Sequence, residues 1–172
     1  GPLLIFAGAG SGKTRVLTRA DLESIAELAL ANDLIILADE IYGRILYEGE
    51  HVSIASLPGM AERTVVLDGF SKTYAMTGWR LGYAIVPEWL SFAFGRLIIN
   101  SVSNVCSFAQ HGAVEALRGP QDEVDRMVAE FHARRDLVVD GLNAIPGISC
   151  LRPSGAFYVL PQVSGTGLTG AE

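Results

Sequence analysis

The sequence predicts an α/β protein built on a mostly parallel β-sheet. Short apolar runs of strand length occupy residues 34–38, 64–67 and 83–86. Segments with helical periodicity lie before and after these runs. Continuous apolar runs are typical of strands that are covered on both faces, and their alternation with helices indicates parallel pairing. Residues 3–7 predict one further short strand, which leads into a glycine-rich turn at residues 7–14.

The first helix is expected to start at Thr18 and to end near Asn32. Thr18 and Asp21 have the spacing of a capping box, in which each residue satisfies a free backbone N–H group of the other. Apolar side chains then recur every three or four residues, which predicts one buried helical face. The helix therefore has a defined start and a defined orientation toward the sheet.

Three more helices are expected in the second half of the chain. Two cover about residues 88–100 and 105–118, and a long one opens at Gly119 and Pro120 and stops before Pro146 and Gly147. Proline near the first position and acids in the first turn favour this start. Residues 148–151 and 155–160 predict strands of a second unit that the chain only begins.

Composition limits the class of protein. The 172 residues are 49% apolar and carry a net charge of −6. Lys and Arg are scattered rather than clustered, which argues against a nucleic-acid surface. No uninterrupted apolar stretch reaches the roughly 18 residues of a membrane span, and the absence of a charged-then-apolar pattern leads us to expect no signal peptide. With two cysteines expected as free thiols, these features predict a cytoplasmic globular protein.

Two reactive side chains follow neighbouring strands of the predicted sheet. Asp39 ends the apolar run 34–38, and Lys72 follows the run 64–67. Ligands of parallel sheets bind beyond the carboxyl ends of the strands. The two residues are 33 positions apart, about one strand, crossover and strand, so they can share one rim of the sheet.

The residues around this pair predict a pyridoxal phosphate (PLP) site. The aldehyde of that cofactor needs an amine for a Schiff base, which Lys72 offers, and its pyridine nitrogen needs a carboxylate, which Asp39 offers. Arg80 can hold the phosphate with a fork of permanently charged donors, and Tyr42 can contact the ring hydroxyl. The three histidines share no ligand spacing, so no metal site is expected.

From about residue 18 to residue 163 the chain resembles the class I/II aminotransferases, the aspartate-aminotransferase-like branch of the fold-type I PLP enzymes. The motifs that carry the resemblance are ADEIY at 38–42, GFSKTYAMTGWRLGY at 69–83 and PSGAFY at 153–158. It implies a Schiff base on Lys72, a pyridinium partner in Asp39, and cofactor contacts from Tyr42 and Arg80. It also implies amino transfer between an amino acid and a 2-oxo acid, in a homodimer.

The same resemblance implies a truncated enzyme. Residues 19–119 correspond to part of the large PLP-binding domain, with a three-layer, mostly parallel sheet; residues 120–146 correspond to the connecting helix; and residues 147–172 start the small α+β domain. The family's earlier phosphate-binding turn and its later carboxylate-binding arginine have no counterpart here. This chain alone is therefore expected to bind PLP weakly and to transaminate little or not at all.

Residues 1–18 favour a different origin. The stretch AGAGSGKT at 7–14 resembles the P-loop motif of superfamily-one DNA helicases, with Lys13 on the terminal phosphates and Thr14 on Mg²⁺. The alternative function is therefore an ATP-binding module, and the chain is interpreted as a chimera of the two families. A helix running unbroken from Lys13 would favour nucleotide binding, whereas a start at Thr18 would favour the aminotransferase. A third hypothesis is that the chain has no biochemical function.

Overall fold

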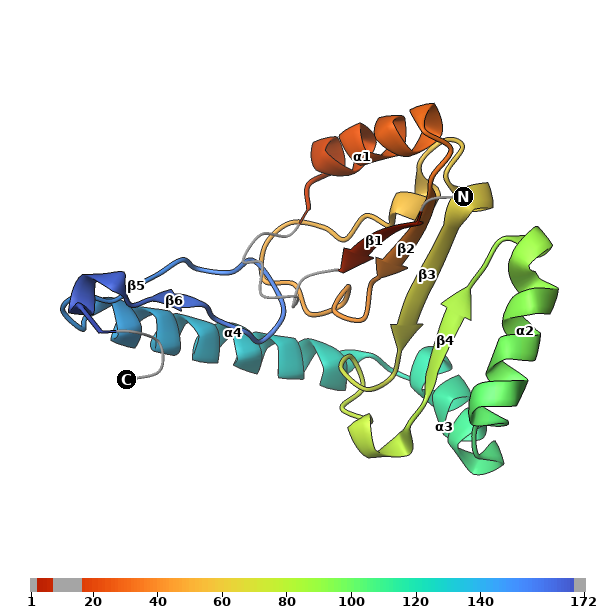
Figure 1. Ribbon diagram of the computed structural model, residues 1–172. Coiled ribbons are helices and arrows are strands. Elements are labelled where there is room, and N and C mark those ends of the chain that lie inside the picture. Colours follow the sequence, from red (N-terminus) through yellow and green to blue (C-terminus); the bar gives the residue numbers. More distant parts are fainter. Residues whose placement is uncertain (1–2, 8–16, 169–172) are drawn as a thin grey trace.

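A four-stranded sheet in the order β1-β2-β3-β4 forms the centre of the computed structural model, which describes residues 3–7 and 17–168 (Figure 1). Its strands are β1 (Leu3–Ala7), β2 (Ile35–Asp39), β3 (Thr64–Gly69) and β4 (Gly82–Ile85). β1 pairs with β2 and β2 pairs with β3 in parallel, whereas β3 and β4 are antiparallel. The prediction of an α/β fold with a mostly parallel sheet is confirmed.

The main core lies between the sheet and helix α1 (Arg19–Ala31). Leu22, Ala26 and Ala29 on one face of α1 pack against Ile36 and Ala38 of β2. Ile36 and Ala29 are fully buried. Burial of this apolar surface, at about 25 cal/mol per Å², holds α1 on the sheet.

The connection from β2 to β3 completes this core without an α-helix. It contains two short 3-10 turns, Ile54–Ser56 and Ala61–Arg63, and its Leu57 and Met60 join the α1 cluster. A parallel connection needs a crossover of a dozen or more residues, and a loop of this length meets that need.

Strand β4 runs antiparallel to β3. Residues 70–81 return the chain to the neighbouring edge of β3 through one 3-10 turn at Thr77–Trp79, starting from the end of β3 at which they leave it. The connection therefore closes a loop at one end of the sheet and does not cross over it. The third strand expected from the apolar run is thus present, one residue earlier than expected.

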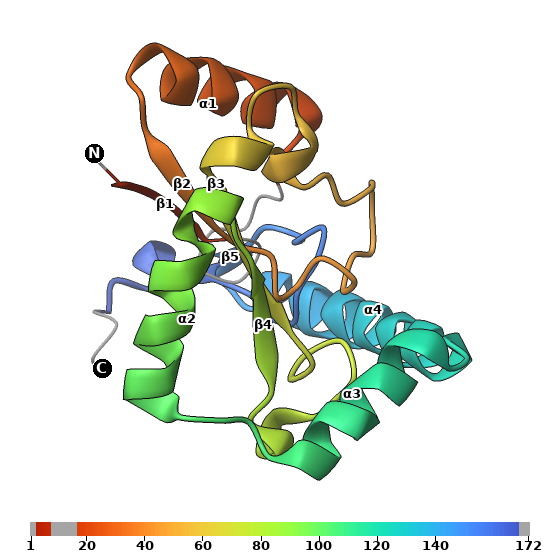
Figure 2. The same cartoon turned by 90° about the vertical axis from the view of Figure 1, so that its right-hand side faces the viewer.

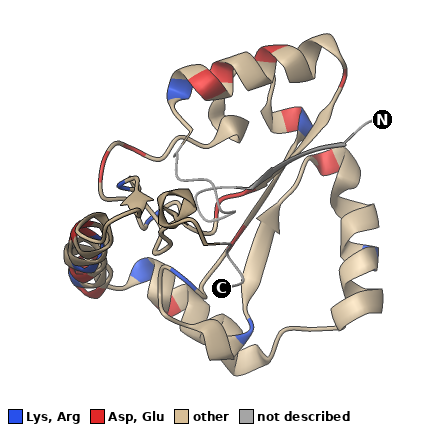
Figure 3. Ribbon diagram, turned by 60° about the vertical axis from the view of Figure 1, so that its left-hand side comes forward, with Lys and Arg blue, Asp and Glu red and all other residues tan. Residues whose placement is uncertain are grey.

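Helices α2 (Glu88–Val102) and α3 (Ser107–Arg118) lie beside β4, and α4 (Asp122–Asn143) extends from them toward the second sheet (Figures 1 and 2). α2 buries none of its side chains, and Phe92 is 76% exposed. Figure 3 shows charged residues distributed along α1 and α4, whereas α2 is almost without charge. No helix in residues 3–7 and 17–168 combines the length and apolar character needed to cross a bilayer.

The end of the chain differs from the sequence expectation. A two-residue strand β5 (Ser149–Cys150) pairs antiparallel with β6 (Pro161–Gln162), and the side chain of Asn143 in α4 bonds both backbone groups of Cys150. The predicted strand at 155–160 was wrong. Ala156 has a φ of 56°, outside the β region, and its N–H donates to Ile45 O instead of to a sheet partner.

The capping box at the start of α1 is confirmed. Thr18 Oγ1 accepts a hydrogen bond from Asp21 N at 3.3 Å, and Asp21 Oδ2 accepts one from Thr18 N at 2.8 Å. Leu17 and Thr18 are not helical, so no helix runs unbroken from Lys13. The helix starts where the aminotransferase interpretation places it.

Thr18→Ala is expected to lower the free energy of unfolding by about 1 kcal/mol, because one backbone N–H of the first turn loses its acceptor. Urea unfolding followed by circular dichroism measures the change. Thr18→Ser keeps the hydroxyl and serves as the matched control. Equal losses in the two variants would show that the hydroxyl is not the stabilising group.

Candidate active site

The loop 70–81 between β3 and β4 carries Lys72 and Arg80 and is closed at its base. Gly69 pairs with Gly82, and Phe70 N donates to Leu81 O at 3.3 Å. A Cβ atom on Gly69 would lie 2.9 Å from Gly82 Cα, so the close approach of the strands requires glycine here. The closed base fixes both ends of the loop to the carboxyl end of β3.

Asp39 is the last residue of β2, at the same edge of the sheet. It lies opposite Leu67 in β3, and Glu40 N continues the ladder by donating to Leu67 O at 2.8 Å. Asp39 Oδ1 accepts a hydrogen bond from Ile41 N at 3.3 Å, which holds the start of the following turn. Asp39 and Lys72 therefore extend from adjacent parallel strands, as the sequence predicted.

Two aromatic rings surround the Lys72 ammonium. Its Nζ lies 5.8 Å from the centroid of Tyr42 and 5.7 Å from that of Phe157. Both distances are within the range of a cation–π interaction. The structure thus brings Lys72 and Tyr42 together, and it adds Phe157 from a segment 85 residues further along the chain.

Tyr158 binds Tyr42 directly. The two phenol oxygens are 2.8 Å apart, and the rings of Tyr42, Phe157 and Tyr158 make edge or tilted contacts with centroids 5.0 to 5.7 Å apart. Residue-by-residue reasoning did not select Phe157 or Tyr158 as site residues. Their membership of the PSGAFY motif was the signal that could have found them.

The Tyr42 phenol stays protonated at neutral pH. Burial raises its pKa above the ordinary value, and the hydrogen bond with Tyr158 and the negative charge of Asp39 act in the same direction. Tyr42 is therefore a hydrogen-bonding phenol with a carboxylate on one side and an ammonium over its ring face. It is also 8% exposed, which shields these interactions from water.

Backbone hydrogen bonds fix the segment that carries Phe157 and Tyr158. Gly155 forms a β-bridge with Leu46, and Tyr47 N donates to Ser154 O at 2.9 Å. The Tyr47 hydroxyl donates to Ala156 O. The segment 153–158 is thus attached to the loop that follows β2, the same loop that carries Tyr42.

The buried Arg135 of α4 also holds the segment 153–158 against the loop after β2. Its Nη1 donates to Pro153 O at 2.8 Å and to Glu48 at 3.0 Å, and its guanidinium lies 5.0 Å from the Tyr47 ring centroid. A buried guanidinium needs such partners, because an unpaired buried charge is strongly destabilising. One side chain therefore joins α4, the loop after β2 and the segment 153–158.

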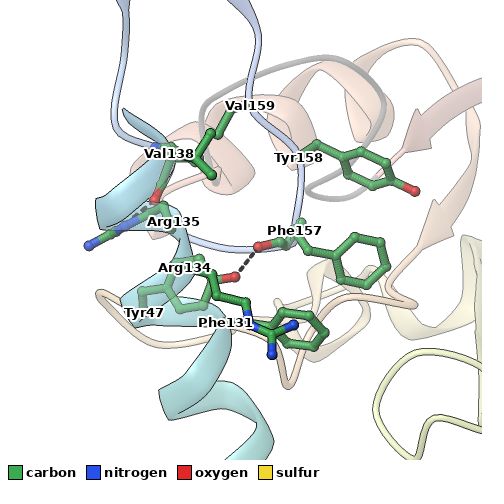
Figure 4. Close-up of a pocket in the computed structure, with 10 residues that line it drawn as sticks. Tyr47, Phe131, Arg134, Arg135, Val138, Phe157, Tyr158 and Val159 are labelled. Atoms are coloured by element: carbon green, nitrogen blue, oxygen red, sulfur yellow. Dashed lines mark hydrogen bonds between the residues drawn. The ribbon is translucent and has the colours of Figure 1, made fainter. Parts of the chain in front are cut away.

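A cavity of about 370 Å³ lies beside this junction, between α4 and the segment 153–159 (Figure 4). Its wall is largely apolar and aromatic, with Phe131, Val138 and Phe157, and with the Arg134 and Arg135 side chains at one side. In Figure 4 the rings of Phe157 and Tyr158 extend the same way, away from Val138 and Arg135. Both residues line the cavity, and the ring of Phe157 also lies 5.7 Å from Lys72 Nζ.

Arg80 lies near the C-terminal end of the same loop. It has a φ of 53°, its Nη1 donates to Thr77 O at 3.1 Å, and it lines a second cavity with α2 and α3 residues such as Val102 and Phe108. Within residues 17–168, the Arg80 side chain hydrogen-bonds to the backbone of its own loop, at Thr77. The structure therefore brings together Lys72 and Tyr42, with Asp39 on the adjacent strand, and leaves the guanidinium of Arg80 exposed.

Strained backbone is concentrated around this site. Among the described residues, five non-glycine residues have a positive φ, and three of them are Ala75, Arg80 and Ala156. Such conformations cost about 1 to 3 kcal/mol and tend to persist at functional sites. Two of the three lie on the lysine loop and the third directly precedes Phe157.

A polar cluster holds Glu40, next to Asp39. Its two carboxylate oxygens accept hydrogen bonds from Ser53 at 2.7 Å and pair with His51 Nε2 at 2.8 Å. The bond with Glu40 raises the pKa of the His51 imidazole above its ordinary value, although burial opposes the shift. The cluster joins the start of the β2–β3 connection, at Glu40, to its middle, at His51 and Ser53.

Comparisons with known proteins agree with this arrangement. A sequence profile of the family described as aminotransferase class I and II matches residues 2–169. Aromatic-amino-acid aminotransferase 2 of Thermococcus litoralis is 44% identical over 91% of the chain, and aspartate aminotransferase of Pyrococcus abyssi is 42% identical over 91%. The chain therefore belongs to the aminotransferase class I and II family.

Solved structures give the same fold. The aromatic aminotransferase of Pyrococcus horikoshii matches 97% of the chain with a TM-score of 0.92 and 39% identity. The aspartate aminotransferase of Rhizobium meliloti matches 95% with a TM-score of 0.91 and 37% identity. The chain covers 45% and 42% of those two structures and 41% of each of the two curated relatives. It thus has part of the fold-type I aminotransferase architecture and spans about two fifths of a relative's length.

The nucleotide-binding alternative gains no support from these findings. Lys13 and Thr14, on which it depends, lie outside the residues that the structure describes. The family match begins at residue 2 and runs through the P-loop-like segment. The foreign origin of residues 1–18 stays a prediction.

The His51–Glu40 pair is expected to make stability depend on pH. The pKa of His51 is higher in the folded chain than in the unfolded chain, where it is about 6.5. Its stabilising contribution is therefore fully present below that unfolded value and is lost as pH rises through the folded pKa. Urea unfolding between about pH 5 and pH 9 should show this decline.

His51→Gln should remove that part of the pH dependence, whereas replacement of the exposed His111 by Gln should retain it. If stability still declined in the same way with rising pH in His51→Gln, another group would be responsible for the pH dependence.

Proposed function

We propose that this chain is a fragment of a PLP-dependent aminotransferase, which transfers an amino group between an amino acid and a 2-oxo acid through Lys72. The observation that carries the proposal is the position of Lys72 Nζ, 5.8 Å from the centroid of the buried Tyr42 ring. Lys72 lies on the loop that follows β3, the strand adjacent to the one that ends in Asp39. Membership of the aminotransferase family supports it.

The side chains around Lys72 fit the chemistry of this cofactor. PLP, when bound, supplies an aldehyde for an amine and an electron-withdrawing ring that stabilises negative charge on the substrate. Lys72 offers the amine, on a loop closed at its base by Gly69 and Gly82. Tyr42 offers a phenol that is protonated at neutral pH, and Asp39 a carboxylate at the rim of the sheet.

Each residue has a distinct task in this proposal. Lys72 would hold the cofactor through its amine. Once the amino group of the substrate had displaced it, that amine would remove and return the proton at the α-carbon of the substrate. Asp39 would keep the ring nitrogen protonated, Tyr42 would donate a hydrogen bond to the ring oxygen, and Arg80 would hold the phosphate with charge-assisted hydrogen bonds. The aromatic rings of Tyr42 and Phe157 exclude water from one side of the lysine.

We assign residues 19–119 to part of the large domain, residues 120–146 to the connecting helix and residues 147–172 to the start of the small domain. The complete protein is proposed to act in the cytoplasm as a homodimer. One of the two relatives is named for aspartate and the other for aromatic amino acids, so the proposal extends to amino acids as a class. The fragment alone is expected to bind PLP weakly.

PLP added to the chain is expected to produce a visible absorption band that Lys72→Ala abolishes. The sequence contains two lysines, Lys13 and Lys72, so Lys13→Ala is a matched control that should keep the band. Borohydride reduction followed by peptide mapping locates the modified amine. A band that survives in Lys72→Ala, or a label on Lys13 alone, would refute the proposed site.

Arg80→Ala is expected to raise the dissociation constant for PLP about 10- to 100-fold, because a hydrogen bond to a charged phosphate contributes about 1.5 to 3 kcal/mol. The Lys72-dependent band should return at saturating PLP. Arg96→Ala, which removes the same charge from exposed α2, is the control. If both variants lost PLP affinity to a similar extent, Arg80 would act only through the general attraction of a positive charge for an anion.

A further inference from the structure

Tyr42 has a second partner besides Lys72, and it comes from the far end of the chain. The Tyr158 hydroxyl lies 2.8 Å from the Tyr42 hydroxyl, and the two residues are separated by 116 positions. Their rings meet edge to face, with centroids 5.7 Å apart. This hydrogen bond joins the segment 153–158 to the phenol that the proposed function assigns to the cofactor.

The hydroxyl of Tyr42 has limited hydrogen-bonding capacity. A phenol has one proton and two lone pairs, and it can rotate only its O–H bond. The Tyr42 ring is fixed by burial and by contact with Phe157 at 5.2 Å, so the position of its oxygen is set by the surrounding chain. A bond to Tyr158 on one side leaves the other side of this oxygen for a ligand.

Tyr158 is itself held in place while remaining accessible. Its backbone follows the strained Ala156, whose N–H donates to Ile45 O at 2.8 Å. The Tyr158 side chain is half exposed, and within residues 17–168 its described hydrogen bond is the one to Tyr42. A tyrosine needed only for packing would not require an oxygen directed at another phenol.

We propose that Tyr158 is a positioning residue of the Lys72 site, which acts through Tyr42 by fixing the phenol oxygen where it meets the cofactor ring. The inference rests on the proposed function, because it assumes that Tyr42 contacts the cofactor. The charged side chains of Lys72 and Asp39 interact with Tyr42, Lys72 over its ring and Asp39 through the effect of its negative charge on the phenol. The uncharged Tyr158 hydroxyl orients the Tyr42 hydroxyl by a direct hydrogen bond. The segment after α4 thus completes a site whose other members lie before residue 81.

A double-mutant cycle tests whether Tyr158 acts through Tyr42. PLP affinity is measured from the Lys72-dependent band for the parent chain, Tyr158→Phe, Tyr42→Phe and the double variant. Tyr158→Phe keeps the ring and removes the hydroxyl, and it should weaken binding about 2- to 10-fold, the value of one net hydrogen bond. In the Tyr42→Phe background the same change should have no further effect.

A matched control separates positioning from loss of any phenol group. Tyr74 donates its hydroxyl to Gln121 at 3.3 Å, away from Tyr42, so Tyr74→Phe should leave PLP affinity unchanged. An unaltered affinity in Tyr158→Phe would overturn the inference. So would an equal loss in the presence and absence of the Tyr42 hydroxyl, because Tyr158 would then act independently of Tyr42.

A second measurement needs no cofactor. The chain has five tyrosines, and ¹³Cζ labelling with assignment by single Phe variants gives one resonance for each. The Tyr42 resonance at neutral pH should move in Tyr158→Phe and stay in place in Tyr74→Phe. An unmoved resonance would overturn the inference by itself. Absence of a Lys72-dependent band in the parent chain would overturn the proposed function instead, while the resonance still decides whether Tyr158 orients Tyr42.

Discussion

The parallel pairing of β2 with β3 is the constraint on which the rest of this structure depends. It brings the carboxyl ends of both strands to one edge, with Asp39 opposite Leu67 and the lysine loop directly beyond. The short return to β4 then closes that loop at Gly69 and Gly82. Because backbone hydrogen bonds set these positions, the amine and the carboxylate are brought to one edge before any ligand is present.

A second constraint comes from the buried Arg135. Its guanidinium binds Pro153 O and Glu48 and lies over Tyr47, so α4 is joined to two loops that are far apart in sequence. The arrangement fixes the backbone of the segment that carries Phe157, which lies near Lys72, and Tyr158, which binds Tyr42. Helix α4 is therefore a structural support for the candidate site.

Helix α2 leaves its side chains unburied. Its apolar side chains, such as Phe92, are exposed beside β4, although the sequence of the helix is one that normally packs against other elements. The chain covers 41% of its curated relatives, so much of a relative's structure has no counterpart here. Helical periodicity located α2 correctly, but it could not show what the helix would pack against.

The sequence by itself determined the α/β class and the capped start of α1 at Thr18, because capping and apolar periodicity are local patterns. It allowed Asp39 and Lys72 to share one rim of the sheet, and the pairing of β2 with β3 decided that they do. Only the tertiary structure decided that residues 155–160 are not a strand and that Phe157 and Tyr158 join Lys72 and Tyr42. Residues 155–160 are apolar enough for a strand, but Ala156 adopts a positive φ to bond with Ile45. Contacts across 85 to 116 residues have no local signature, since they arise from the packing of α4 and the loop after β2.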